Sequence, residues 1–148
     1  MLVLHYTGMK DGPSALARLC AFDAEVSAHY LVEEDGRVFA LVEEDKRAWH
    51  AGQGRWRGRE DINSRSIGVE IVNGGHDYGL PPYPRAQIDA VADLCLDIVR
   101  RWAIPAVQIV AHSDIAPARK EDPGEHFPWA RLAERGVGLW PRESDASG

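Results

Sequence analysis

One stretch of this chain of 148 residues decides its fold: Ser66-Ile67-Gly68-Val69-Glu70-Ile71-Val72. Its branched apolar side chains and low polarity predict a strand at the centre of a sheet rather than a half-solvated edge strand. Glu70 interrupts the apolar pattern, and an unpaired carboxylate is costly to bury. We therefore expect Glu70 to pair with a cation or to face a cleft; the alternative is an outward-facing residue on an exposed face of the sheet.

The segments around this strand predict a mixed sheet covered by helices. Short apolar runs at 2–6 and 107–111 are typical of further strands. An Asp35-Gly36 pair marks a hairpin between strands at 27–32 and 37–42. Apolar residues at the helical period predict helices at 14–22 (with Ser14 as the N-cap), at 85–102 and at 129–134. We expect an α/β fold, a single domain with a mixed central β-sheet flanked by helices.

Length and composition indicate one ordinary globular domain. We assign residues 1–136 to that domain and 137–148 to a polar C-terminal tail. The formal net charge of −6 argues against nucleic acid or an anionic membrane as a partner, because both require a basic surface. No run approaches the ~20 apolar residues of a membrane span, and no basic-then-apolar leader is present. If the sequence is the whole natural chain, we expect a cytoplasmic protein; a chain whose leader had been removed would look the same. We also expect a monomer. Cys20 and Cys95 fall in apolar helical patterns, which favours buried thiols over a disulfide.

Two histidines and an aspartate lie at the ends of apolar runs or in the loop after one. His5 is near the end of the run at 2–6, His112 follows the run at 107–111, and Asp122 lies in the loop beyond it. Two imidazoles and one carboxylate are the ligand set of a catalytic zinc ion that keeps its fourth position for water, whereas magnesium and calcium prefer oxygen ligands. The alternative is two histidines bonded to the backbone and an aspartate that caps a loop, and spacing alone does not decide between them.

Five motifs follow one another along the chain: Leu4-His5-Tyr6-Thr7, Ser27-Ala28-His29-Tyr30, Arg47-Ala48-Trp49-His50-Ala51-Gly52, Ser66-Ile67-Gly68-Val69-Glu70-Ile71 and His112-Ser113-Asp114-Ile115-Ala116-Pro117. Together they resemble the zinc-dependent N-acetylmuramoyl-L-alanine amidases, in particular the branch of the bacterial AmpD and AmiD enzymes, which is related to phage T7 lysozyme and to peptidoglycan-recognition proteins. The resemblance runs from about Leu2 to Leu132 and implies the fold of that family.

The resemblance also implies roles for five residues. The zinc ligands of the family match His5, His112 and Asp122, and its catalytic glutamate and lysine match Glu70 and Lys120. Next to a zinc-activated water, Glu70 would act as the general base and pass the proton to the leaving amine. Lys120 would stabilise the oxyanion of the tetrahedral intermediate. Apart from the resemblance, a surface lysine is the commoner case.

Three further residues are candidates for substrate binding. By resemblance, His50 lies in a loop that lines the groove and helps to position the substrate. Arg57 and Arg59 follow in the next loop, where relatives contact acidic groups of the peptide or sugar, and a guanidinium pairs well with a carboxylate. Each of the three could equally be a solvated loop residue. Among the remaining polar residues, we expect His29 to be structural, Asn73 to cap a strand end, and His76 and His126 to be exposed.

The resemblance implies hydrolysis of the amide bond between the lactyl group of N-acetylmuramic acid, or its 1,6-anhydro form, and the L-alanine of the stem peptide. Because the chain shows no leader, we expect a role in muropeptide recycling. One alternative is a peptidoglycan-binding module without catalysis, although such relatives typically lack a zinc ligand and all three are present here. The other alternative is a lytic amidase that acts on the intact cell wall.

Overall fold

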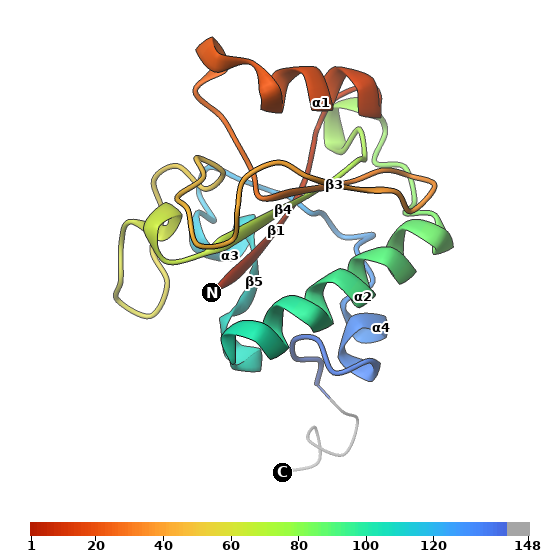
Figure 1. The fold of residues 1–148 in the computed structure, drawn as a ribbon. Helices are drawn as coiled ribbons and strands as arrows, with labels where there is room; N and C mark the ends of the chain where they lie inside the picture. Colours follow the sequence, from red (N-terminus) through yellow and green to blue (C-terminus); the bar gives the residue numbers. More distant parts are fainter. Residues whose placement is uncertain (142–148) are drawn as a thin grey trace.

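The computed structural model describes residues 1–141, which form a five-stranded sheet with helices around it (Figure 1). The strand order is β3-β2-β4-β1-β5. β4 pairs in parallel with β1 and β2, β1 pairs in parallel with β5, and β3 is antiparallel to β2, so the predicted mixed α/β sheet is confirmed. The strands are β1 (Leu2–Tyr6), β2 (Tyr30–Val32), β3 (Val38–Ala40), β4 (Ile67–Ile71) and β5 (Ile109–Ala111).

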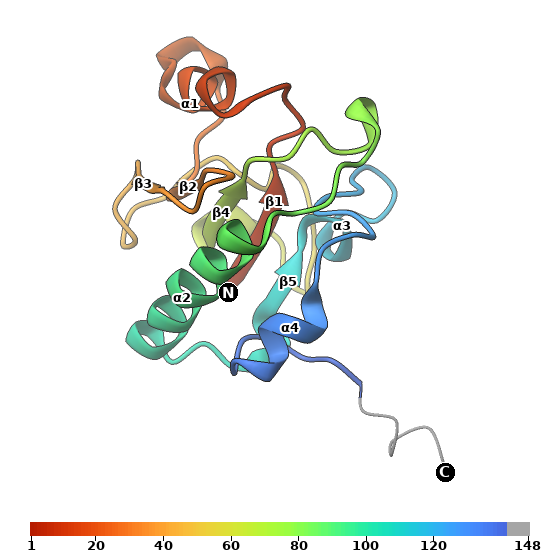
Figure 2. The same cartoon turned by 90° about the vertical axis from the view of Figure 1, so that its right-hand side faces the viewer.

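Four α-helices surround the sheet: α1 (Gly12–Cys20), α2 (Arg85–Trp102), α3 (His112–Ile115) and α4 (Trp129–Glu134). Short 3₁₀ turns lie at Phe22–Ala24, Ile62–Ser64, His76–Tyr78 and Ala106–Gln108. α2 and α4 lie close together, whereas α1 lies beyond the carboxyl end of β1 (Figures 1 and 2). Among residues 1–141, no helix has both the length and the apolar character that crossing a membrane requires.

The central strands are buried on both faces, as the apolar stretch at 66–72 predicts. Every residue of β4 is buried. Leu2 and Leu4 of β1 pack into the main core with residues of α2 and α4, while Val3 packs into a second core with Ile62 and Ile115. Because successive side chains of a strand point to opposite faces, His5 points to the same face as Val3. The metal-ligand candidate on β1 therefore faces away from α2.

The first helix differs from the prediction at its start and in the environment of its cysteine. α1 begins at Gly12, and its N-cap is Asp11, whose side chain accepts a hydrogen bond from the backbone N–H of Ser14 at 2.8 Å. Ser14 is thus inside the first turn. The prediction of two buried thiols is correct for Cys95 and wrong for Cys20, which is exposed on the outer face of this short helix.

The loop between β5 and Asp122 contains a helix that the sequence analysis did not predict. The chain turns directly from β5 into α3, and the carboxylate of Asp114 accepts a hydrogen bond from the backbone N–H of Ala111 at 2.8 Å. Residues 142–148 of the predicted tail lie outside the described residues, and Val137 at its start is buried in the main core.

Candidate functional site

The candidate ligands meet at the carboxyl ends of the central parallel strands. His5 on β1 lies directly opposite Glu70 on β4 in the strand pairing. His112 begins α3, immediately after β5, which is the other neighbour of β1. Asp122 is held beside it, because the backbone N–H of Ser113 donates to the Asp122 carbonyl at 3.1 Å. This edge of an open α/β sheet is where such folds commonly bind ligands.

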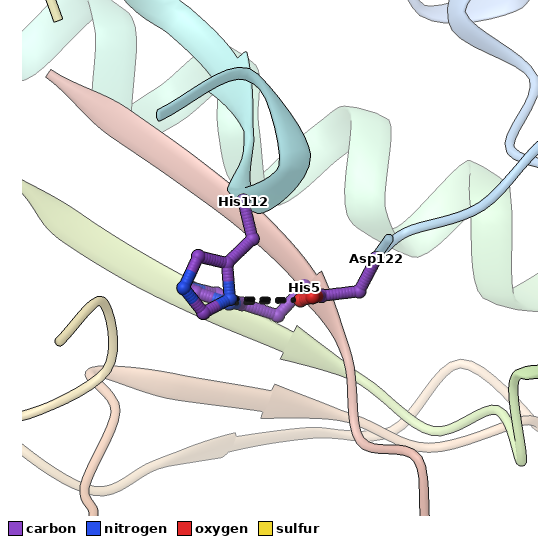
Figure 3. Close-up of side chains that lie close together, drawn as sticks. All are labelled: His5, His112 and Asp122. Atoms are coloured by element: carbon purple, nitrogen blue, oxygen red, sulfur yellow. Dashed lines mark hydrogen bonds and ion pairs between the residues drawn. The ribbon is translucent and has the colours of Figure 1, made fainter. Parts of the chain in front are cut away.

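His5, His112 and Asp122 form a compact buried cluster (Figure 3). The Nδ1 atoms of the two histidines are 2.9 Å apart, and Asp122 Oδ2 lies 3.1 Å from each of them. The three residues are 1%, 5% and 6% exposed, respectively. Burial alone would raise the pKa of the Asp122 carboxyl, but the two imidazoles beside it hold that pKa below its ordinary value.

The outer ring nitrogens of the two histidines have protein partners. His112 Nε2 lies 2.8 Å from the backbone carbonyl of Ala51, which can only accept, so in the neutral ring the proton lies on Nε2 and the lone pair on Nδ1. His5 Nε2 lies 3.0 Å from His50 Nδ1. Two imidazole nitrogens and one carboxylate oxygen directed at one point are a donor set that suits a borderline-soft divalent cation, so the residues present fit a catalytic metal.

Glu70 is buried beside this cluster and does not lie on an exposed face of the sheet. The residue is 8% exposed, and its Oε1 lies 3.9 Å from His5 Nδ1. Burial, together with the negative charge of Asp122, raises its pKa well above the ordinary value, and the positive charge of Lys120 partly opposes this. A raised pKa favours the uptake of a proton, as a general base requires.

A polar groove of about 770 Å³ opens onto the cluster. Its walls come from the end of β1, from α1 and from the loop between α3 and Asp122. It is lined by six of the candidate site residues identified from the sequence: His5, His50, Glu70, His112, Lys120 and Asp122.

The three predicted substrate-binding residues are placed differently from one another. His50 borders the groove, but it is only 5% exposed, and its ring lies against His5. The structure does not bring Arg57 and Arg59 to this groove. They line a separate hollow with Met1, at the start of β1 and about 13 Å from His5 along the strand at about 3.3 Å per residue.

His29 is structural, as predicted. Its Nε2 lies 2.7 Å from the carbonyl of Lys46, and its Nδ1 accepts the backbone N–H of Gly68 at 3.0 Å. Asn73 holds the loop after β4, since it accepts the N–H of Gly75 at 2.8 Å and donates to the carbonyl of Pro81 at 2.9 Å.

The prediction of two exposed loop histidines is correct for His126 and wrong for His76. His76 is partly buried between Tyr6 and Glu125, with its Nδ1 2.9 Å from the Tyr6 hydroxyl and its Nε2 3.0 Å from Glu125 Oε1. The hydrogen bond with Glu125 raises the pKa of His76. No periodic pattern in the sequence indicates this contact, because it joins loops 49 residues apart.

Comparison with known proteins places this chain in one family. The family model described as N-acetylmuramoyl-L-alanine amidase matches residues 1–125, and the chain belongs to that family. It is 44% identical to the amidase AmiD of Escherichia coli over 95% of this chain and 54% of that protein. It is 43% identical to the 1,6-anhydro-N-acetylmuramyl-L-alanine amidase AmpD of Enterobacter cloacae over 72% of this chain and 55% of that protein.

Solved structures of this family also match the fold of the chain. The complex of E. coli AmiD with the substrate anhydro-N-acetylmuramic acid-L-Ala-D-gamma-Glu-L-Lys superposes with a TM-score of 0.90 at 43% identity, and the match covers 97% of this chain and 60% of that one. The chain therefore spans a little over half the length of these relatives.

Proposed function

We propose that this chain hydrolyses the amide bond between the lactyl group of N-acetylmuramic acid, in its 1,6-anhydro form, and the L-alanine of a stem peptide. The observation that carries the proposal is the meeting of His5, His112 and Asp122 with Glu70 and Lys120 in one groove. The AmiD complex adds support, because that relative binds an anhydromuramyl tripeptide as its substrate.

We further propose zinc as the metal, held by His5, His112 and Asp122. Their mixed nitrogen and oxygen donors suit zinc better than magnesium or calcium, which prefer oxygen ligands alone. When bound, zinc lowers the pKa of a coordinated water to about 7 and polarises a carbonyl oxygen. Three protein ligands leave a coordination position for that chemistry, which distinguishes a catalytic from a structural zinc site.

In this proposal Glu70 moves the proton. Its carboxylate takes a proton as water attacks the carbonyl carbon and gives that proton to the nitrogen of the departing L-alanine. The raised pKa suits both steps, because the group must accept a proton readily and release it again. Lys120 is close enough to affect the pKa of Glu70, and its positive charge would stabilise the developing oxyanion.

Substrate contact by His50, Arg57 and Arg59 remains a prediction. Only His50 borders the groove, and the two arginines would reach the substrate only if it extended to the start of β1. The expected cytoplasmic location and monomeric state also remain predictions, which cell fractionation and light scattering would test.

Mass spectrometry of the products tests the proposal. The protein should convert anhydro-N-acetylmuramyl-L-Ala-D-γ-Glu-L-Lys into the free sugar acid and the intact tripeptide, and Glu70→Gln should retain its metal but lose turnover. Glu134→Gln, an exposed glutamate on α4, is the matched control and should react like wild type. Retention of the uncleaved substrate with measurable binding would instead favour a peptidoglycan-binding module without catalysis.

The same experiment with insoluble cell walls separates recycling from lysis. A recycling enzyme should cleave the soluble fragment much faster than it clears a suspension of purified walls. Clearing of the suspension at a rate comparable to the soluble reaction would favour the lytic amidase.

A further inference from the structure

A series of hydrogen bonds runs from the Nε2 atom of His5 through His50 to Ser66. His5 Nε2 lies 3.0 Å from His50 Nδ1, and His50 Nε2 lies 3.0 Å from the hydroxyl oxygen of Ser66. That hydroxyl donates to the backbone carbonyl of Ile62 at 2.6 Å. Ile62 is fully buried and lies in the 3₁₀ turn just before β4, so the series of hydrogen bonds ends at the backbone of a buried residue.

The direction of each hydrogen bond follows from the carbonyl acceptor at the end of the series. A carbonyl can only accept, so the single hydroxyl proton of Ser66 is committed to Ile62, and Ser66 must accept from His50 Nε2–H. In a neutral His50 ring, a proton on Nε2 leaves a lone pair on Nδ1, which accepts from His5 Nε2–H. His5 then presents a lone pair at Nδ1, toward His112 and Asp122.

His112 reaches the same tautomer by a different route, through the Ala51 carbonyl. The two Nδ1 lone pairs and the Asp122 carboxylate therefore converge without a proton donor of their own. Three acceptors at 2.9 to 3.1 Å are mutually unfavourable unless a cation lies among them.

We propose that His50 and Ser66 are positioning residues that hold His5 in the tautomer that binds metal through Nδ1. This inference rests on the proposed function, because it concerns the same metal site. It gives His50 a role that does not require contact with substrate. It also accounts for Gly68, since a Cβ at that position would lie 2.3 Å from His50 Cγ and leave no room for the ring.

Ser66→Ala tests the inference with a small change at a partly exposed position. Loss of the hydroxyl removes the acceptor for His50 Nε2–H and allows the other His50 tautomer, whose Nδ1–H would oppose His5 Nε2–H. Zinc affinity, measured by competition with a chromophoric chelator, should fall by about 10- to 100-fold, as is typical when a ligand loses its orienting partner. Ser64→Ala is the matched control: its hydroxyl accepts from exposed Arg47, and its zinc affinity should equal that of wild type.

Long-range ¹H–¹⁵N correlation spectra of the imidazoles give a second readout that a merely structural role would not change. In metal-free protein at about pH 8, above the ordinary pKa of histidine, the wild-type spectrum should place the proton of His5 on Nε2. In Ser66→Ala it should show a mixture of His5 tautomers. An Nδ1 proton on His5 in wild type, or wild-type zinc affinity in Ser66→Ala, would overturn the inference. Failure of wild type to cleave the muropeptide would overturn only the proposed function, since neither readout uses substrate.

Discussion

Gly68→Ala is the perturbation whose consequences the structure defines most sharply. Gly68 lies inside β4, on the face that carries Glu70, and the ring of His50 packs directly on its backbone. A Cβ at this position would lie 2.3 Å from His50 Cγ and 2.5 Å from its Nδ1. The ring would have to retreat by about 1 Å to reach the 3.4 Å of an ordinary contact, which is enough to break its 3.0 Å hydrogen bond with His5.

Two opposing terms set the size of the effect. Overpacking of a well-packed interior costs about 1–3 kcal/mol. The lower backbone entropy of alanine in the unfolded chain offsets about 0.4–1 kcal/mol. The free energy of unfolding should therefore fall by about 1–2 kcal/mol, and Tm by about 2–8 °C for a domain of this size.

Thermal and urea unfolding of metal-free protein, followed by circular dichroism, measures this loss. The control is a double-mutant cycle with His50→Ala, which removes the atoms that clash. In that background Gly68→Ala should cost little or nothing, because the two changes share one contact. Equal costs in both backgrounds would refute the steric explanation, as would a Gly68→Ala protein that unfolds at the wild-type temperature.

Three further changes test other parts of the structure. The pKa of Glu44 is lowered to about 2, chiefly by its hydrogen bond to Arg101, so this pair stabilises the fold above about pH 5 and less as the pH falls toward 2. Glu44→Gln should lower the free energy of unfolding at pH 7 by only about 1 kcal/mol, since half-exposed Arg101 is screened by solvent. In urea melts, this difference from wild type should shrink as the pH falls. Glu43→Gln, at an exposed position, should match wild type at every pH. Asp11→Ala removes the N-cap of α1 and should lower the free energy of unfolding by about 1 kcal/mol in the same melts. Asp11→Asn keeps a side-chain acceptor and should be nearly as stable as wild type. Lys120→Met should lower kcat by about 10²–10³ without loss of bound zinc, and an unchanged kcat would remove Lys120 from the proposed chemistry.

The parts of the fold with a long or uniform pattern could be predicted from the sequence. The strand at 2–6 and the helices at 85–102 and 129–134 have the predicted bounds. The strand is a short apolar run, and the long helix keeps its buried residues at the helical period. The start of α1 could not be predicted, since Asp11 and Ser14 are both good caps and only the folded chain shows which side chain accepts the hydrogen bond. The two strands predicted for the hairpin, at 27–32 and 37–42, are longer than the observed β2 and β3. Where a strand ends depends on its pairing with residues distant in the sequence.

Of the candidate site, too, only a part could be predicted from the sequence. Residues at strand ends could be predicted to meet, because the parallel strands β1, β4 and β5 fix where their carboxyl ends lie. The path of the loop with Arg57 and Arg59 has no such constraint, and it leads to the other end of the sheet. The position of His50 behind His5 also escaped prediction, although Gly68 carries a signal: a glycine within a strand often marks the close approach of another group.

Anomalous scattering from crystals grown with zinc, recorded on both sides of the zinc absorption edge, would locate the metal itself. We expect one strong peak in contact with His5 Nδ1, His112 Nδ1 and Asp122 Oδ2, at about 2.0–2.2 Å from each. The same crystals of His112→Ala should lose that peak. A peak bound by other residues, or no peak at this cluster in protein that cleaves the anhydromuramyl tripeptide, would show that these three residues are not the ligands of a catalytic zinc ion.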